Sequence, residues 1–255
     1  MSRGRGDAGI RFRPLEPFRI GYRLTAMASA FKWTIRILAG LFGLSLLGVI
    51  AYRVVPAPVT PLMLLRAIEG EPIHAPWLAQ RDIPPVIVEA VLTSEDQRFC
   101  LHHGFDFQQI DKALAAQDDG KRLRGASTIS QQAARDLYLL PVRSFVRKGL
   151  EAYYTVLMEA LWPKARIAQA YLNTIEWGPG VYGVEAASLY AFHHPAQRLT
   201  AHEAALLAAI LPNPRRWSAA APTAYIRERA QTILDRMSRH EADTTCVKSL
   251  GEKSE

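Results

Sequence analysis

The sequence contains little cysteine: Cys100 and Cys246 are the only two in 255 residues, and no C-x-x-C pair occurs. Two cysteines exclude both the disulfide framework of a small secreted scaffold and a cysteine-rich zinc site. The histidines His102-His103 and His193-His194 are adjacent pairs, so they lack the i, i+4 spacing of a helical zinc site. No metal-binding residues are therefore expected, and a small, buried apolar role is expected for Cys100.

Charged residues are also scarce, at 22% against 49% hydrophobic residues. This balance excludes a wholly disordered chain and leaves enough apolar mass for a sizeable core. The net charge of +7 could by itself indicate a nucleic-acid partner. However, residues 1–36 hold eight basic side chains against Asp7 and Glu16, so the other 219 residues carry only +1. The basic excess belongs to the N-terminal tail, and no nucleic-acid partner is expected.

One long apolar run, residues 37–52, contains no charge. With the residues just before it, the run reaches about 20 residues, the length that crosses roughly 30 Å of hydrocarbon. We therefore expect a single transmembrane helix at 31–53, a basic cytoplasmic tail at 1–30, and the rest of the chain on the other side of the membrane. The alternative is a cleaved signal peptide. The long basic region and the large side chains at 52–55 argue against it, because cleavage sites need small residues.

Sustained period-two alternation and internal repeats are both absent after the apolar run. Five prolines predict a semi-extended stalk at 54–78, and the polar composition of 239–255 predicts a flexible tail. Between them, 79–238 shows helical signals, such as apolar residues at three- and four-residue steps in 144–161. The fold class is therefore expected to be mainly α.

Several helix starts have capping residues. Asp106 and Thr200 each precede a Gln or Glu by three residues, and Ser127 precedes a helical pattern. Residues 118–125 break the helical pattern with two glycines and dense charge, which predicts a mobile loop. Such a loop is usually a solvated connection, and a substrate-covering role is the alternative that its place between two polar segments suggests.

Three segments carry more polar chemistry than a helical core needs. In 94–106, an apolar helix ends at Glu95 and Asp96, where partial desolvation would raise the pKa of a carboxyl toward that of a general base. In 125–137, a hydroxyl, an amide and a cation share one helix face at i, i+4 and i+7. In 147–151, a cation and a carboxylate are i, i+4 partners. Taken singly, the first segment is more often an exposed helix end and the third more often a surface ion pair, and a solvated helix face could also produce the second.

The order and spacing of these segments are far more specific than any one of them. The chain closely resembles the family-51 glycosyltransferases, the peptidoglycan glycosyltransferases, over about residues 80–238. The resemblance rests on three tandem motifs and on later stretches. The motifs are E-D-x-x-F-x-x-H-x-G-x-D from Glu95, G-x-S-T-I-x-Q-Q from Gly125 and R-K-x-x-E from Arg147; the later stretches are A-Y-L-N at 170–173, W-G-P-G-V-Y-G-V-E-A-A-S at 177–188 and E-A-A-L-L-A-A-I-L-P-N-P at 203–214.

The resemblance implies a lysozyme-like helical fold and the polymerisation of lipid II into β-1,4-linked glycan strands. The growing glycan is then the donor, the anomeric carbon inverts in one displacement, and undecaprenyl diphosphate leaves. A monofunctional member is expected, without the penicillin-binding transpeptidase domain of bifunctional members. The chain departs from the family at Arg135 and Asp136, where lysine and asparagine are common, and at Gln169, which replaces an acidic residue.

The resemblance also assigns roles to residues of the three motifs. Glu95 is expected to take the proton from the attacking 4-hydroxyl, and Glu151 to orient cations or assist departure of the diphosphate. The remaining expected site residues bind substrate, three of them as cations that stabilise the diphosphate. These residues are Asp96, His102, Thr128, Gln132, Arg135, Arg147 and Lys148.

The expected partners are lipid II, the lipid-linked glycan, the membrane, and cell-wall synthesis or division proteins. A divalent metal, Mg²⁺ or Mn²⁺, bound with the substrate diphosphate is an open expectation. Two other functions stay open on the sequence. A lysozyme-like lytic enzyme would also use an early helical glutamate but would need no cations for a diphosphate. A non-catalytic division scaffold would be expected to lack Glu95 or Glu151, and both are present.

Overall fold

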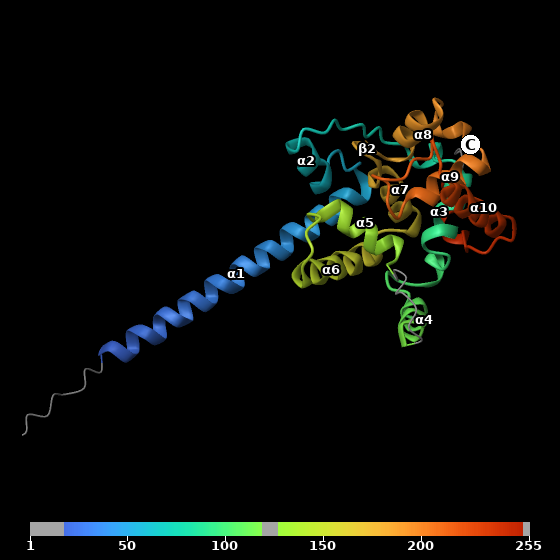
Figure 1. Cartoon of the computed structure of the whole chain (residues 1–255). Helices are drawn as coiled ribbons and strands as arrows, with labels where there is room; N and C mark the ends of the chain where they lie inside the picture. The colour runs from blue at the N-terminus through green and yellow to red at the C-terminus, as the bar shows by residue number, and fades with distance from the viewer. Residues whose placement is uncertain (1–17, 119–126, 252–255) are drawn as a thin grey trace, which may run out of the picture. The chain divides into compact units, whose positions relative to one another are not determined.

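A computed structural model describes residues 18–118 and 127–251 (Figure 1). The chain forms two units, 1–47 and 48–255. The helices and strands, in chain order, are α1 (Phe18–Val54), α2 (Pro61–Ile68), η1 (Gln80–Asp82), α3 (Pro85–Glu95), η2 (Phe99–Leu101), α4 (Phe107–Asp118), α5 (Ile129–Tyr138), α6 (Phe145–Leu161), α7 (Lys164–Thr174), β1 (Glu176–Gly178), β2 (Val181–Tyr182), α8 (Val184–Phe192), η3 (Ala196–Arg198), α9 (Ala201–Ile210), α10 (Ala224–Ser238) and η4 (Thr245–Val247). The expectation of a mainly α fold is confirmed.

Helix α1 contains the apolar run. Over Phe31–Val54 it has a mean hydropathy of 2.0 and is long and apolar enough to cross a membrane. Among the described residues it is the only helix that meets this criterion. The helix begins at Phe18, so part of the expected cytoplasmic tail at 1–30 is helical as well.

The core of the second unit is built around α7 and α9. From Ala165 to Thr174 every residue of α7 is buried, and Ala204–Ile210 of α9 are buried likewise. Helices α5, α6 and α8 pack against α7, while α3 and α10 pack against α9. The two central helices therefore hold the ends of α3, α5 and α6 in fixed places, and these ends carry the polar segments.

A two-stranded antiparallel sheet follows α7. Strand β1 pairs with β2, and His74 adds an isolated parallel bridge to Val181. Gly180 turns between the strands at φ +73, a left-handed conformation that glycine adopts without strain. Hairpins this short are stable only when packed on other elements, and here both strands are buried.

Residues 54–78 differ from the semi-extended stalk that their prolines suggested. Helix α2 begins where Thr60 accepts a hydrogen bond from the backbone N of Met63, which is buried. Further on, the backbone N of Leu78 donates to Oδ1 of Asn173, in α7, at 2.7 Å. This segment lies against the domain because it supplies a helix and backbone donors to it.

Residues 239–251 differ from the expected flexible tail. Ala242, Val247 and Leu250 are buried and belong to the hydrophobic core. A disulfide joins Cys100 to Cys246 across 146 residues of sequence. Polar residues dominate the composition of this segment, but three apolar side chains and one covalent bond are enough to fix it. The isolated apolar role expected for Cys100 is wrong, since its sulfur is disulfide-bonded.

The predicted helix starts are mostly confirmed. Thr200 forms a capping box with Glu203, and Asp106 accepts a hydrogen bond from the backbone N of Gln109. At α5 the cap is Thr128 and not Ser127, because Gln131 completes the capping box one residue later. The loop predicted at 118–125 lies, apart from Asp118, outside the described residues.

Candidate functional site

Glu95 is the last residue of α3, a helix whose Ile87, Val88, Val91 and Leu92 are buried. Glu95 therefore lies at the edge of the hydrophobic core, and its side chain is 16% exposed. Two adjoining cavities, with volumes of about 630 and 190 Å³, are both lined by Glu95. One side chain therefore stands between a sugar-sized cleft and a smaller recess.

Burial raises the pKa of Glu95 above its ordinary value. Hydrogen bonds from Gln132 and Ser94 oppose this shift, as does the positive charge of Arg229, but desolvation is the largest contribution. A carboxylate with a raised pKa is a better proton acceptor than one in water. The direction agrees with the sequence expectation for a general base.

Gln132 connects Glu95 to the core. Its Nε2 donates to Oε2 of Glu95 at 3.3 Å, and its Oε1 accepts a hydrogen bond from the Tyr171 hydroxyl at 3.2 Å. Tyr171 is fully buried in α7, and burial raises the pKa of its hydroxyl well above the ordinary value. The phenol therefore stays a donor and fixes which end of the Gln132 amide faces Glu95.

Arg135 lies one helical turn beyond Gln132 on α5. Its Nε and Nη2 donate to the two carboxylate oxygens of Asp136 at 2.7 and 3.2 Å, a bidentate pair. Asp136 is buried, whereas the Arg135 side chain is 38% exposed. The neighbouring carboxylate holds the guanidinium in place and leaves part of it open to a ligand.

Glu151 is buried in α6 beneath two cations. Nη1 of Arg147 donates to its Oε2 at 2.6 Å, and Nζ of Lys148 donates to its Oε1. Both carboxylate oxygens therefore accept hydrogen bonds, and these contacts fix the positions of Arg147 and Lys148, one of the two roles expected for Glu151. Because α5 packs on α6, the negative charge of Glu151 also helps to raise the pKa of Arg135. Arg135, Arg147 and Lys148 form one cationic group.

The two glutamates play separate parts. Glu95 is bonded by Gln132 and Ser94, and Glu151 by Arg147 and Lys148. Among the described residues no hydrogen bond joins the two glutamates. Their carboxylates thus have different partners and different surroundings, one apolar and one cationic.

Asp96 and His102, which the sequence predicts to bind substrate, are mostly buried and pair with each other, although Asp96 also lines the smaller recess. Nε2 of His102 lies 3.0 Å from Oδ1 of Asp96, and Oδ2 of Asp96 accepts a hydrogen bond from the backbone N of Ile129 at 2.9 Å. Each residue is 7% exposed. The pair ties the end of α3 to the start of α5, so that Glu95 and Gln132 lie next to each other.

Thr128 likewise uses its side chain within the protein. Its hydroxyl donates to the backbone O of Gly104 at 2.6 Å and caps α5. Gly104 has a φ of +89, and a Cβ there would meet Cγ2 of Thr155 at 2.7 Å. The glycine of the first motif is therefore required by the backbone and by its approach to α6.

Helix α10 contributes cleft residues that the sequence did not single out. Nη2 of Arg229 donates to Oγ of Ser94 at 3.3 Å and lies 4.0 Å from Oε1 of Glu95. Tyr225, Thr232 and Arg236 line the same cleft. These four residues follow each other at helical spacing, and each directly precedes a buried residue of the helix, so they form a stripe beside the buried face. This stripe was the signal that could have identified them.

The side chains described around this site do not include a typical set of metal ligands. Among the described residues no group of three or more His, Cys, Asp or Glu side chains could hold a metal ion. The two oxygens of Glu151 already accept from Arg147 and Lys148. The residues do not fit a protein-bound metal, and any divalent ion would have to be bound by a ligand's own oxygens.

The geometry suits the transfer of a group that leaves as an anion. Glu95 can accept a proton from a hydroxyl in the cleft, and the cationic group on α5 and α6 can stabilise negative charge on a departing phosphate. A hydrolytic site for a sugar alone would have no use for three such cations.

The comparisons with known proteins agree with this chemistry. A family model described as Transglycosylase matches residues 63–238. A protein of Chromohalobacter salexigens is 53% identical over 207 residues, which cover 78% of this chain and 87% of that protein. One of Rhodospirillum centenum is 50% identical over 218 residues, covering 83% of this chain and 94% of that protein. Each is named "Biosynthetic peptidoglycan transglycosylase".

Proposed function

The chain belongs to the transglycosylase family, and we propose on this premise that it is a peptidoglycan glycosyltransferase with a lysozyme-like helical domain. Its substrates are lipid II and the growing lipid-linked glycan. It joins them by β-1,4 links with inversion at the anomeric carbon and releases undecaprenyl diphosphate. The observation that carries the proposal is the pairing of one desolvated carboxylate, Glu95, with a separate cationic group at Arg135, Arg147 and Lys148.

The reaction is a single displacement. The acceptor's 4-hydroxyl attacks the anomeric carbon while Glu95 takes its proton, and the bond from that carbon to the diphosphate oxygen breaks. The electron pair leaves with the diphosphate, whose charge Arg135, Arg147 and Lys148 stabilise. Glu151 holds two of these cations in place and accepts no proton in this scheme.

Gln132 and Arg229 support Glu95. The Gln132 amide and the Arg229 guanidinium both favour the ionised carboxylate, while the apolar end of α3 disfavours it. The result is a carboxylate that is charged before the reaction and gains a proton during it. Thus the three elements α3, α5 and α10 together set its basicity.

A divalent ion, Mg²⁺ or Mn²⁺, remains a proposal as a companion of the substrate. Bound to diphosphate oxygens, it would supply additional positive charge to the leaving group. Polymerisation with and without a chelator tests this, and restoration by added Mg²⁺ or Mn²⁺ is the expected result.

The location proposed for the enzyme is the bacterial inner membrane, as a single-pass protein with a cytoplasmic N-terminus and a periplasmic domain. The apolar helix at Phe31–Val54 and the basic residues before it support this orientation. The Cys100–Cys246 disulfide supports it independently, because disulfides persist in oxidising compartments such as the periplasm.

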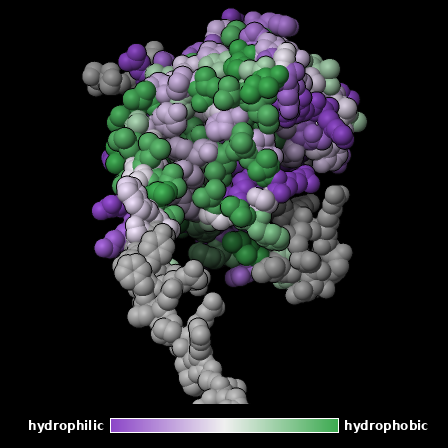
Figure 2. Space-filling view, turned by 90° about the vertical axis from the view of Figure 1, so that its left-hand side faces the viewer, coloured by the Kyte–Doolittle hydropathy of each residue, from purple (hydrophilic) through white to green (hydrophobic). Residues whose placement is uncertain are grey.

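The membrane is also a proposed partner of the domain itself. Figure 2 shows hydrophobic surface on the face of the domain turned toward the viewer. Helices α2 and α6 lie on that side of the domain in Figure 1 and carry exposed apolar side chains. These side chains are Leu64, Ile68, Phe145, Val146 and Leu150. Lipid substrates make contact with a bilayer surface useful, since a tethered enzyme searches in two dimensions. Cell-wall synthesis or division proteins remain proposed partners.

One assay tests the function. Purified full-length protein in detergent should convert lipid II into polymer, and the same protein should release no fragments from purified glycan strands. Fragments without polymer would show a lytic enzyme. Neither product, from a folded protein, would indicate a non-catalytic scaffold.

A further inference from the structure

The segment 239–251 lies beyond the residues that the family model matches, 63–238, yet it is fixed to the domain. Val247 and Leu250 are buried. Near its end, the backbone N of Gly251 donates to the O of Gln80 at 3.0 Å, and Gln80 Nε2 donates to Oγ of Ser249 at 2.7 Å. Both ends of the segment are therefore attached, the first by its continuity with α10.

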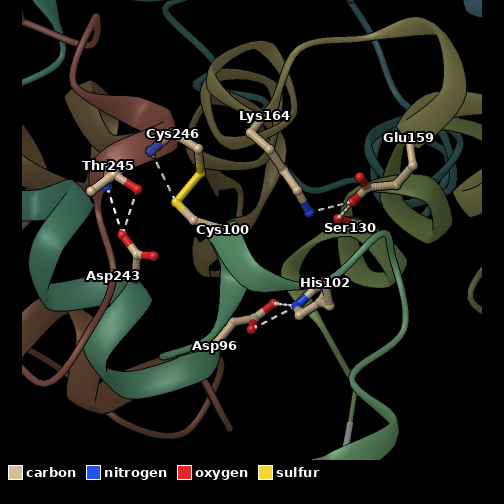
Figure 3. Close-up of a disulfide and its surroundings, with 9 residues drawn as sticks. All are labelled: Asp96, Cys100, His102, Ser130, Glu159, Lys164, Asp243, Thr245 and Cys246. Atoms are coloured by element: carbon tan, nitrogen blue, oxygen red, sulfur yellow. Dashed lines mark hydrogen bonds and ion pairs between the residues drawn. A yellow bond between two sulfur atoms is a disulfide. The ribbon is translucent and has the colours of Figure 1, made fainter.

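The middle of segment 239–251 forms hydrogen bonds with the loop that follows Glu95. The backbone N of Asp243 donates to the O of Gln97 at 3.1 Å, and Gln97 Nε2 donates to Oε2 of Glu241 at 3.2 Å. Three residues further on, Cys100 is covalently bonded to Cys246 (Figure 3). The contacts reach within two residues of Glu95.

The opposite side of the same loop is held by the domain interior. Figure 3 shows Asp96 and His102 facing each other, with the Cys100–Cys246 bond attached to the same stretch of chain. Nζ of Lys164 lies 4.3 Å from the centre of the Phe99 ring and donates to Glu159. Loop 96–102 is thus clamped between α5 and α7 on one side and segment 239–251 on the other.

We propose that segment 239–251 is a brace, closed by the Cys100–Cys246 disulfide, that positions Glu95 for proton abstraction. Cys100 and Cys246 are positioning residues: they act through loop 96–102 and touch no substrate. The proposal rests on the proposed function of Glu95 as the base. The alternative is a disulfide that only stabilises the folded state.

The brace can be opened chemically in the intact protein. Both cysteines are half-buried, so a dithiol reductant reaches them. A thiolate of dithiothreitol attacks one sulfur of the disulfide, and its second thiol then closes the reagent into a cyclic disulfide. The S–S bond breaks, and the two cysteines gain two electrons and two protons as thiols.

Opening the brace should affect kcat and leave KM nearly unchanged. Freedom in loop 96–102 misplaces Glu95, and a shift of about 1 Å can cost on the order of 10²-fold in rate. We expect kcat to fall about 10-fold or more. The KM for lipid II should stay within about twofold, because Arg135, Arg147 and Lys148 lie on α5 and α6 and keep their partners.

The pH profile should change as well. Groups that face Glu95 are Ser94 and Asp96 beside it, Gln132 on α5, Tyr171 on α7 and Arg229 on α10. All of these groups remain when the disulfide is reduced, so a change in the pH profile would reflect a change in the hydration of Glu95. Better hydration lowers the raised pKa of Glu95, and the acid limb of kcat/KM should move to lower pH.

The experiment compares full-length wild type with Cys100→Ser/Cys246→Ser, each with and without dithiothreitol. We expect the reductant to lower kcat in the wild type and to have no effect on the double variant, which should already be slow. Reoxidation should restore the wild type. Val184→Ala, on α8 away from the cleft residues, serves as a control that lowers stability without loosening the brace.

Two outcomes would overturn the brace. One is a folded double variant with wild-type kcat and an unmoved acid limb, whose melting temperature alone is lower. The other, decisive if the double variant does not fold, is reduced wild type that keeps its far-ultraviolet circular dichroism and full kcat. Failure of the proposed function looks different, since the oxidised wild type would then make no polymer.

Discussion

Gln132 shows how a single side chain can set the properties of another. Its amide spans Glu95 and Tyr171, so the buried phenol decides which end of the amide meets the carboxylate. Replacing Gln132 with Glu would place two carboxylates next to each other. Replacing it with an apolar residue would remove the hydrogen bond to Glu95, whose side chain could then rotate. The hydrogen bond that Glu95 receives from Gln132 thus depends on residues of three helices, α3, α5 and α7.

Glu95→Gln is expected to abolish most catalysis. The change keeps size and hydrogen bonding but removes the proton acceptor, and loss of a general base typically costs about 10²–10⁴-fold in kcat. Binding of lipid II should change little, because the cationic group is untouched. Lipid II polymerisation rates measure this, with Asp111→Asn, an exposed carboxyl on α4, as the control. A Glu95→Gln protein that polymerises at a near wild-type rate would contradict the mechanism.

The same substitution should stabilise the fold at neutral pH. Burial raises the folded-state pKa of Glu95 above its unfolded value, so the folded protein binds more protons and stability falls as pH rises through that window. Gln carries no charge, so the stability of the variant does not fall for this reason as the pH rises. The melting temperature of Glu95→Gln should exceed that of the wild type at pH 7.5 and match it below about pH 4, where both states of Glu95 are protonated. An equal difference at both pH values would exclude a buried-charge origin.

Arg135→Ala is expected to weaken diphosphate binding and the transition state together. Loss of one preorganised donor typically costs about 10²–10³-fold in rate. Because Asp136 is buried and paired with Arg135, the single variant also leaves an unpartnered carboxylate. Arg135→Ala/Asp136→Asn removes that cost, so its melting temperature should recover while kcat/KM stays low. Recovery of both would mean that Arg135 acts on stability alone.

Residues of the site differ in how far sequence could predict them. The pKa of Glu95 follows from its own helix, whose apolar residues are adjacent in sequence. Asp96 and His102 share that motif but face inward, because Asp96 meets the backbone of Ile129, which is 33 residues away. Thr128 is turned inward for a similar reason, by Gly104. Type and spacing identify polar side chains, and only the fold decides which of them reach solvent.

At the scale of elements, the site is assembled from helix ends. Helix α3 ends at Glu95, α5 starts at Ile129 after its cap Thr128, and α6 starts two residues before Arg147. Side chains at helix ends have fewer neighbours from their own helix, so they can face a shared cleft. The buried central helices α7 and α9 supply the rigid support behind them.

Gly104→Ala should disrupt one such junction. The residue has a φ of +89, and the added Cβ would meet Thr155 of α6 at 2.7 Å. Strain of this kind typically costs about 1–3 kcal/mol, roughly 2–12 °C in melting temperature for a domain of this size. Gly149→Ala is the control, since a Cβ there meets nothing within 4 Å and an alanine favours the helix. Thermal unfolding should therefore move in opposite directions for the two variants; a fall for both would point to a general sensitivity of α6.

Helix positions were the most predictable elements, and the ends of the domain the least. Capping and periodicity are local, so Thr200 and Asp106 mark real helix starts. Proline content at 54–78 and polarity at 239–255 are also local, but docking depends on distant partners such as Asn173 and Cys100. Composition therefore describes how a segment behaves alone and not what holds it in the folded protein.

At the scale of the whole molecule, the chain combines one apolar helix, consistent with a membrane anchor, with one transglycosylase domain. The helix at Phe31–Val54 carries no acidic residue and the rest of the chain after it carries a nearly balanced charge. If the helix is an anchor as proposed, hydrophobic transfer into the bilayer and not electrostatic attraction would hold the protein at the membrane.

The topology predicts the behaviour of reporter fusions. Alkaline phosphatase fused after Glu255 should be active, and a fluorophore that matures only in the cytoplasm should be dark at the same position. Fusion at the end of the chain keeps segment 239–251 intact. Fluorescence without phosphatase activity would place the domain in the cytoplasm and separate it from its proposed substrates.

The disulfide also imposes an order on biosynthesis. Cys246 follows its partner Cys100 by 146 residues, and most of the domain lies between them. The bond can therefore close only after every helix from α4 to α10 has been synthesised. Until then loop 96–102 has no covalent attachment to segment 239–251, so the proposed positioning of Glu95 would be completed late in folding.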